Sequence, residues 1–180
     1  MQFLTDFADQ AVILPLVVAI AASLSWWPRG ALVWLLVCGA TLGAIGAGKL
    51  MVFRFGPFAL APTLLSPSGH VGSAALVYGG LAALLLGGGA MHRGFVAGGG
   101  IALVIGMTRV GLGVHSIADV IAGGTIGTLG AVALVRLAGP CPKDLRRMLP
   151  IAASCIVVLA THGLHLPAEI WLRTISASGW

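Results

Sequence analysis

The chain has 180 residues, of which 58% are hydrophobic and only 8% are charged. Soluble globular domains carry about a quarter charged residues, so this composition excludes a soluble fold and indicates a membrane protein. The formal net charge is +5. Its basic residues stand singly or in one short cluster without interleaved aromatics, so we expect no nucleic-acid partner.

Six apolar segments approach the length of about 20 residues that a membrane helix needs. In chain order they cover residues 10–27, 30–48, 71–90, 94–112, 116–138 and 149–167. The sequence therefore predicts an all-α integral membrane protein, with about six transmembrane helices in one bundle. The whole chain, residues 1–180, is expected to form a single transmembrane domain.

The distribution of basic residues predicts the orientation of these helices. Three of the predicted connections lie on one side of the bilayer and hold Arg29, Arg93, Arg136, Lys143, Arg146 and Arg147. The positive-inside rule makes that side cytoplasmic and places both termini outside. In the opposite orientation, Lys49 and Arg54 alone would mark the cytoplasmic side. The acidic N-terminus, with Asp6 and Asp9, differs from a signal peptide, so the first apolar stretch is expected to remain as an anchor.

Small residues at helical spacing predict close contacts between helices, since small side chains let backbones approach in a membrane. The pairs are Gly39 with Gly43, Ala102 with Gly106, and Gly123 with Gly127.

One group of residues in the C-terminal region leaves three interpretations open. His162, His165 and Glu169 are spaced to share one helix face, where they would form a metal site, a set of interfacial polar residues, or a polar rim beside the substrate. Trp171 and Trp180 are typical of an amphipathic segment at the membrane surface.

The remaining ionisable residues gather at the predicted outward ends of the helices. They are Lys49, Arg54, His70, Arg109, His115 and Asp119. A charged group inside a membrane costs about 2.5 to 3.5 kcal/mol, so such a cluster indicates a functional site.

The residue types in this cluster favour phosphate chemistry. Lysine and arginine side chains bind phosphate, and a histidine acts as a nucleophile or as a general acid. His115 and Asp119 stand four residues apart, so on one helix the carboxylate can orient the imidazole. The backbone amides of Ser68 and Gly69 precede a predicted helix, where an anion is favoured.

Two motifs in this cluster resemble those of a known family. Pro67, Ser68, Gly69 and His70 are followed by Arg109, then five residues and His115, then three residues and Asp119. This pattern is similar to the second and third motifs of the type 2 phosphatidic acid phosphatase superfamily, in its membrane lipid phosphate phosphatase branch. The resemblance extends from about Lys49 to Asp119, within a family-like catalytic core over residues 30–138. The helix at 149–167 is an addition to that core.

The resemblance implies a role for each matched residue. His115 would be the nucleophile, Asp119 its partner and His70 the general acid. Lys49, Arg109 and the backbone of Ser68 and Gly69 would bind the phosphate. The implied reaction passes through a phosphohistidine and requires no metal and no cofactor.

The first motif departs from the family pattern, in which a lysine is followed after six residues by Arg-Pro. Here Lys49 leads to Gly56-Pro57, and the arginine comes two positions early as Arg54. Arg54 either reaches the phosphate through a bent loop or faces lipid headgroups.

The sequence thus predicts a lipid phosphate or lipid diphosphate phosphatase in a cytoplasmic membrane, such as a bacterial inner membrane, with its site facing the exterior. Phosphatidic acid, phosphatidylglycerol phosphate, a polyprenyl diphosphate and a glycolipid phosphate all fit as substrates, and membrane lipids are the other expected partners. A phosphotransferase using the same histidine remains an alternative. An anion transporter is another, but its path would place polar residues through the midplane.

Overall fold

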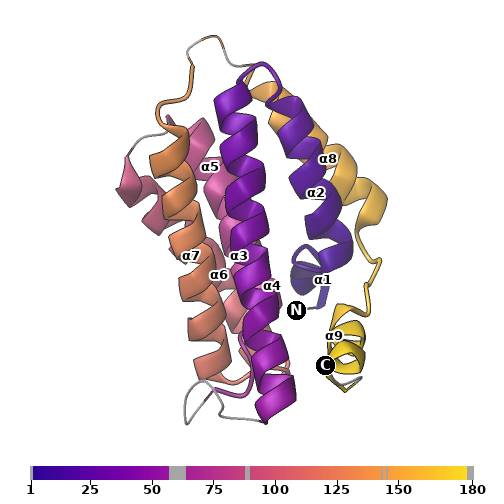
Figure 1. Ribbon diagram of the computed structural model, residues 1–180. Coiled ribbons are helices and arrows are strands. Elements are labelled where there is room, and N and C mark those ends of the chain that lie inside the picture. Colours follow the sequence, from indigo (N-terminus) through magenta and orange to yellow (C-terminus); the bar gives the residue numbers. More distant parts are fainter. Residues whose placement is uncertain (1, 57–63, 88–89, 143, 145, 178–180) are drawn as a thin grey trace.

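A computed structural model describes residues 2–56, 64–87, 90–142, 144 and 146–177, and the regular structure in these ranges is helical (Figure 1). Three helices are long and apolar enough to cross a membrane. They are α3 (Pro28–Phe55), α6 (Met91–Gly111) and α7 (Ile117–Ala138). The all-helical character agrees with the sequence prediction, and in the described ranges three of the about six predicted transmembrane helices reach this length.

Three shorter apolar segments complete the bundle. These are α2 (Gln10–Ser23), the continuous helical segment Gly69–Leu85 and α8 (Met148–Thr161). The segment Gly69–Leu85 consists of α4 (Gly69–Ala74), the π-helical turn η1 (Ala75–Gly79) and α5 (Gly80–Leu85). At 1.5 Å per residue, a helix of 14 residues extends about 21 Å, which is less than the hydrocarbon thickness of about 30 Å. Two short helices, α1 (Gln2–Asp6) and α9 (Ala168–Ala177), lie in the lower half of Figure 1, with α9 below α1.

Two helix ends differ from the predicted ones by six residues or more. Helix α3 continues to Phe55 instead of ending at residue 48, and Gly56, with a φ of 91°, terminates it. The last predicted helix ends at Thr161 instead of residue 167, because Gly163 adopts a φ of 84° and the chain turns before α9. Glycine adopts this left-handed conformation without steric cost, which explains both terminations.

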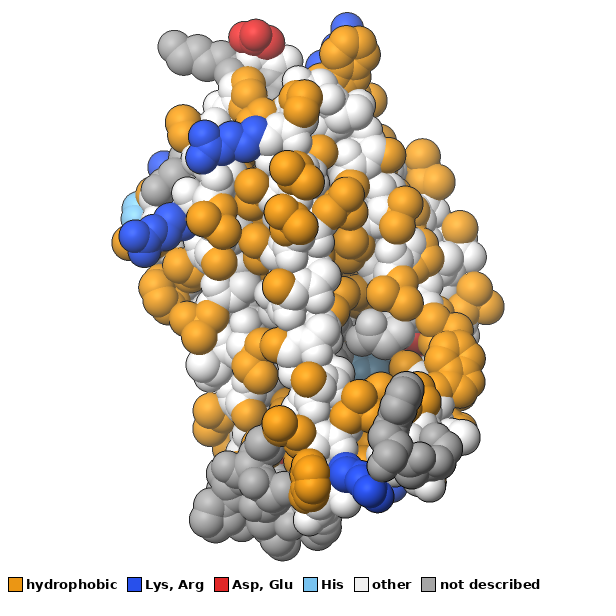
Figure 2. Space-filling view, in the orientation of Figure 1, with side chains coloured by type: hydrophobic (Ala, Val, Ile, Leu, Met, Phe, Trp, Pro, Cys, Tyr) orange, Lys and Arg blue, Asp and Glu red, His pale blue; other side chains and the backbone are white. Residues whose placement is uncertain are grey.

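Apolar side chains fill the interior and also cover the outside of the bundle. Leu16, Ile20, Trp34 and Leu134 are completely buried in the main core, and the Trp34 indole donates to the Val17 carbonyl at 3.0 Å. Figure 2 shows further hydrophobic side chains along the length of the visible surface. An apolar exterior of this kind is expected for a protein surrounded by lipid.

Arginines at one end of the bundle bind the free carbonyls of neighbouring helix ends. Arg29 Nη2 donates to the Leu137 carbonyl at 3.0 Å, and Arg93 Nη1 donates to the carbonyls of Leu86 and Gly87. The last carbonyls of a helix have no partner within the helix, so these contacts stabilise the chain reversals. Lys143, one of the basic residues used to predict orientation, lies outside the described residues.

Close helix contacts form at two of the three predicted small-residue pairs. A Cβ at Gly123 would lie 2.3 Å from the Ser68 carbonyl oxygen, and one at Gly127 would lie 2.1 Å from that of Gly72. A Cβ at Gly106 would meet the Val120 side chain at 2.5 Å. The prediction was wrong for Gly39 and Gly43, where a Cβ meets nothing described within 4 Å. The spacing of small residues alone does not reveal which face of a helix meets a neighbour.

Substituting alanine for Gly127 is expected to destabilise the bundle by about 1–3 kcal/mol, because the new methyl group must push α7 away from the α4 backbone. The matched substitution Gly39→Ala meets open space and is expected to leave stability unchanged or raise it by up to about 1 kcal/mol. Thermal unfolding of both variants in detergent measures the difference. Equal melting temperatures would contradict the tight packing of α4 on α7.

Candidate active site

Side chains from four helices meet at the end of the bundle opposite the arginines. Lys49 belongs to the last part of α3, His70 to the first turn of α4 and Arg109 to the last turn of α6. His115 lies in the turn between α6 and α7, and Asp119 lies in the first turn of α7. The structure therefore brings the residues of the two complete motifs to one place, together with Lys49.

A capping box at the start of α7 fixes the geometry of His115 and Asp119. The Asp119 amide donates to Ser116 Oγ at 3.1 Å, and the Ser116 amide donates to Asp119 Oδ2 at 3.1 Å. The same Oδ2 lies 3.5 Å from His115 Nδ1. Because Nδ1 faces the carboxylate, Nε2 is the ring nitrogen left for chemistry.

Asp119 also holds the segment that leads into α4. Its Oδ1 accepts hydrogen bonds from the amides of Leu65 and Ser66 at 2.9 and 2.8 Å. The Ser68 amide donates to the Asp119 carbonyl at 3.0 Å. With 1% of its surface exposed, Asp119 is a structural anchor between the two motifs as well as the partner of His115.

The surroundings of His115 favour its neutral form. Burial disfavours the charged imidazolium, and the nearby charges of Lys49 and Arg109 disfavour it further, so the pKa of His115 falls below its ordinary value of 6.5. The contact with Asp119 opposes this shift without reversing it. The imidazole is therefore neutral at neutral pH, the state in which a ring nitrogen has a free lone pair.

Lys49 and Arg109 supply positive charge beside His115. Lys49 Nζ donates to Ser66 Oγ at 3.3 Å and lies 3.7 Å from Glu169 Oε2. Arg109 Nη1 donates to Thr5 Oγ1 at 3.2 Å, whereas its Nε is buried without a partner among the described residues. An unpartnered guanidinium nitrogen at this position is suited to an anionic ligand.

The Ser68 and Gly69 amides differ in their availability. The Ser68 amide is bonded to Asp119 within the fold, as described above. The Ser68 hydroxyl is fully buried and has no partner in the described part of the chain. Gly69 opens α4, so its amide is one of the first-turn donors that have no acceptor within a helix.

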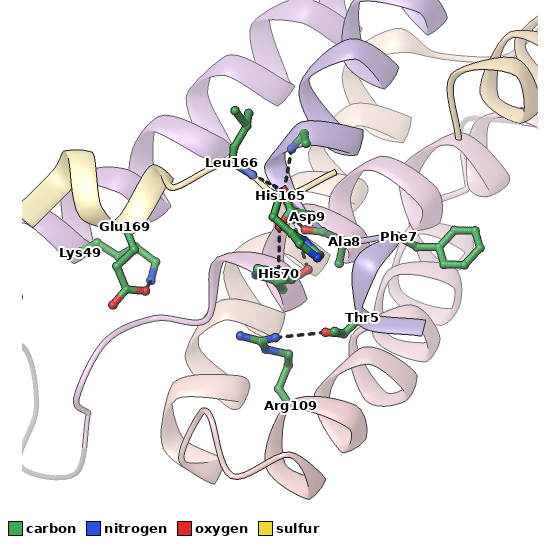
Figure 3. Close-up of polar contacts among 12 residues, drawn as sticks. Thr5, Phe7, Ala8, Asp9, Lys49, His70, Arg109, His165, Leu166 and Glu169 are labelled. Atoms are coloured by element: carbon green, nitrogen blue, oxygen red, sulfur yellow. Dashed lines mark hydrogen bonds and ion pairs between the residues drawn. The ribbon is translucent and has the colours of Figure 1, made fainter. Parts of the chain in front are cut away.

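His70 faces a carboxylate from the N-terminal part of the chain (Figure 3). Its Nε2 lies 3.8 Å from Asp9 Oδ2, which also lies 3.3 Å from His165 Nδ1. Asp9 is the N-terminal cap of α2 and accepts from the Ala11 amide at 2.8 Å. Each of the two motif histidines thus has a carboxylate neighbour.

Arg54 does not join this cluster. Arg54 follows Lys49 by five positions on the continuous helix α3, so its side chain is rotated by about 140° around the helix axis relative to that of Lys49. It is exposed and borders a separate hollow with Leu50, Phe55 and Ile175. A spacing of seven residues, as in the family pattern, would have returned the arginine to within about 20° of the lysine.

Another arginine occupies the site instead. Arg173, on α9, donates to Glu169 Oε1 at 2.9 Å and lies over the Phe53 ring, 4.6 Å from its centroid. Burial acts to raise the pKa of Glu169, but the bond from Arg173 and the charges of Lys49 and Arg173 outweigh burial and lower it. Glu169 is therefore an internal anion between Lys49 and Arg173. The i, i+4 spacing of Glu169 and Arg173 was a readable signal for a helical ion pair, but not for its position at the site.

Two hollows converge on the histidines. A polar cavity of about 790 Å³ is lined by Arg109, His115, Asp119, Glu169 and Arg173, among others. An apolar cleft of about 380 Å³ reaches Lys49, His70 and His115 and is otherwise walled largely by Leu14, Leu42, Ile45, Trp171, Leu172 and Ile175. Arg109, His115 and Glu169 border both, so a molecule with a charged head and an apolar chain fits their junction.

The C-terminal residues considered for a metal site have three different partners. His162 Nε2 lies 3.2 Å from the Phe3 carbonyl, His165 pairs with Asp9, and Glu169 pairs with Lys49 and Arg173. They do not share a helix face, because α8 ends before them. Among the described residues, no group of three or more His, Cys, Asp or Glu side chains is arranged to hold a metal ion. Trp171 lies on α9, and Trp180 lies outside the described residues.

Comparison with known proteins gives one match. The family model described as the PAP2 superfamily matches residues 55–142, a range that contains His70, Arg109, His115 and Asp119. Lys49 and Arg54 precede the matched range. No curated protein and no solved structure matches the chain.

Proposed function

Because residues 55–142 form a domain of the PAP2 superfamily, whose members are generally metal-independent phosphatases, we propose that the protein hydrolyses a lipid phosphate or lipid diphosphate in a membrane. The observation that carries this proposal is the pairing of His115 with Asp119 at a cavity that also contains Arg109. A neutral imidazole oriented by a buried carboxylate beside fixed positive charge is the arrangement that nucleophilic attack on phosphorus requires.

The apolar cleft supports an amphiphilic substrate. Leu42, Ile45 and Leu172 are among the apolar residues of its wall, and His70 and His115 border the same cleft, so an acyl or prenyl chain there would leave its phosphate near the histidines. Burial of such a chain contributes about 0.8 kcal/mol per methylene group, which favours lipids over free sugar phosphates.

In the proposed membrane arrangement, six helical segments cross the bilayer, three of them the long spans α3, α6 and α7. The arginine end of the bundle faces the cytoplasm by the positive-inside rule, so the site opens toward the exterior or periplasm. The three short segments would match the bilayer through tilt and through local thinning of the lipid around them. A bacterial inner membrane fits this arrangement.

In the first chemical step, His115 Nε2 attacks phosphorus, the new N–P bond forms, and the bond to the leaving oxygen breaks. His70 gives a proton to that oxygen, which departs in the alcohol of the lipid, or in the lipid monophosphate when the substrate is a diphosphate. In the second step, His70 removes a proton from water, which attacks phosphorus and breaks the N–P bond. Inorganic phosphate leaves, and both histidines return to their first state.

The phosphate oxygens would be bound by Lys49, Arg109, the Gly69 amide and the Ser68 hydroxyl, with Arg173 in the role of the displaced first-motif arginine. Such groups stabilise the charge that spreads over the oxygens in the transition state. When substrate is absent, the Glu169 carboxylate pairs with Lys49 and Arg173, and the entering phosphate would replace that carboxylate. The Ser68 amide has no part in this binding, because it is bonded to Asp119.

Replacing Arg173 by alanine is expected to lower kcat/KM by about 10- to 100-fold, the cost of losing one hydrogen-bonded charge on a phosphate. Replacing Arg54 by alanine is expected to change it by less than about threefold, since that side chain faces away from the site. Steady-state kinetics of the two variants on one lipid phosphate decide between the arginines. A larger loss of kcat/KM in the Arg54 variant would show that Arg54 binds the phosphate, as the arginine of the family pattern does. Arg173 would then not have replaced it.

The proposed function is tested by measuring phosphate release from purified protein in detergent, with chelator present. The panel contains phosphatidic acid, phosphatidylglycerol phosphate, a polyprenyl diphosphate and a glycolipid phosphate. Release from any of them supports the proposal, and the ranking identifies the substrate. If the lipid phosphate is consumed only when a second lipid or sugar is supplied as acceptor, the protein is a phosphotransferase. Anion flux into liposomes without turnover would indicate a transporter.

A further inference from the structure

The two motif histidines face carboxylates of different origin. Asp119, beside His115, belongs to the matched domain, whereas Asp9, beside His70, precedes α2 and lies far outside residues 55–142. Two histidine–carboxylate pairs at one site raise the question of whether the second pair also contributes to the reaction.

The position of Asp9 is fixed by the backbone around it. Its Oδ1 accepts from the Ala11 amide at 2.8 Å and from the Leu166 amide at 3.1 Å. These bonds orient the carboxylate so that Oδ2 faces His70 at 3.8 Å and His165 at 3.3 Å (Figure 3). Only 9% of the side chain is exposed, so little water screens its charge from His70.

The N-terminal segment, residues 2–9, is docked onto the same helices that carry the site. The Tyr78 hydroxyl donates to the Phe7 carbonyl at 2.7 Å, and Arg109 Nη1 donates to Thr5 Oγ1 at 3.2 Å. Figure 3 shows Thr5 beside Arg109 and Asp9 beside His70. The segment therefore contacts two residues of the proposed reaction from outside the matched domain.

The charges around His70 make a carboxylate partner useful. The cations Lys49 and Arg109 border the same cleft as His70 and disfavour a further positive charge there, whereas the Asp9 carboxylate, 3.8 Å from Nε2, favours one. A general acid must carry its proton when the leaving oxygen departs. We propose that Asp9 is a positioning residue that orients His70 and favours its protonated form when the proton passes to the leaving oxygen. This inference rests on the proposed function, in which His70 is the acid.

The test compares two substrates that differ in their need for an acid. An alkyl oxygen, as in phosphatidic acid, leaves poorly without a proton, whereas the aryl oxygen of p-nitrophenyl phosphate leaves readily. Asp9→Asn keeps the oxygen that accepts from Ala11 and Leu166 but removes the charge. It is expected to lower kcat about 10- to 100-fold for phosphatidic acid and less than about threefold for p-nitrophenyl phosphate.

His70→Ala provides the reference, because loss of the acid itself must show the same selectivity. In the double variant Asp9→Asn/His70→Ala, the first substitution should add nothing, since Asp9 acts only through His70. Asp144→Asn also removes one negative charge and is the control. It is expected to change neither substrate by more than about twofold, because Asp144 is exposed and follows α7 at the end of the bundle opposite the site.

Equal losses on both substrates, or additive losses in the double variant, would overturn the role of Asp9 while leaving the proposed function intact. If His70→Ala lacks selectivity, the acid assignment in the proposed function fails and the role of Asp9 fails with it. Should Asp9→Asn not fold, Asp9→Ser gives the same comparison, because serine is also a favourable N-terminal cap.

Discussion

Alanine in place of His115 is expected to lower kcat/KM roughly 10⁴-fold or more on every lipid phosphate, because the variant lacks the atom that forms the bond to phosphorus. The remaining cations still bind phosphate, so KM is expected to change far less than kcat. Acid hydrolyses a phosphohistidine and base does not, so quenching the active protein with base after mixing with radiolabelled substrate is expected to trap a labelled chain. The His115 variant is expected to trap none.

His92→Ala is the matched control for this experiment. His92 is exposed and lies at the start of α6, at the opposite end of that helix from Arg109. It is expected to keep full turnover and full labelling. Label retained in the His115 variant, or lost in the His92 variant, would show that another residue is the nucleophile.

Most of the fold could be predicted from local sequence properties. All six apolar segments are helical in the structure, since apolar length and the turns at Gly, Pro and Trp define them without tertiary information. The ends of α3 and α8 were predicted wrongly because hydropathy does not report where a backbone leaves the helix. Gly56 and Gly163 decide those ends through a positive φ, which depends on context.

The candidate site was predictable where its residues form compact motifs. His70, Arg109, His115 and Asp119 stand at spacings that identify them, and the structure brings them together. The contributions of Asp9 and Arg173 were not predictable, because each reaches the site from a distant helix. The ion pair of Asp9 with His70 and the position of α9 at the site arise from the packing of the termini, on which single-sequence spacing gives no information. The i, i+4 spacing indicates the pair of Glu169 with Arg173 but not its place at the site.

Substitutions of Asp119 are expected to separate its structural role from its catalytic one. In Asp119→Asn, the remaining carbonyl oxygen can still accept from the Leu65 and Ser66 amides, so the fold is expected to survive. The new amide group would face two donors, the Ser116 amide and His115 Nδ1–H. Loss of the oriented imidazole is expected to lower kcat roughly 10²- to 10⁴-fold with a small change in melting temperature.

Asp119→Ala is expected to destabilise the protein as well, because it removes the acceptor of the amides of Leu65, Ser66 and Ser116. A hydrogen bond to a charged group contributes about 1.5–3 kcal/mol, and water can replace part of it at these half-exposed positions, so the total loss is expected to be about 3 kcal/mol. Turnover and thermal unfolding in detergent measure the two effects, with the exposed Asp144→Asn as a control that changes neither. If Asp119→Asn were as unstable as Asp119→Ala, its lost activity would reflect disruption of the segment before α4. If both variants stayed stable and active, Asp119 would neither orient His115 nor hold that segment in place.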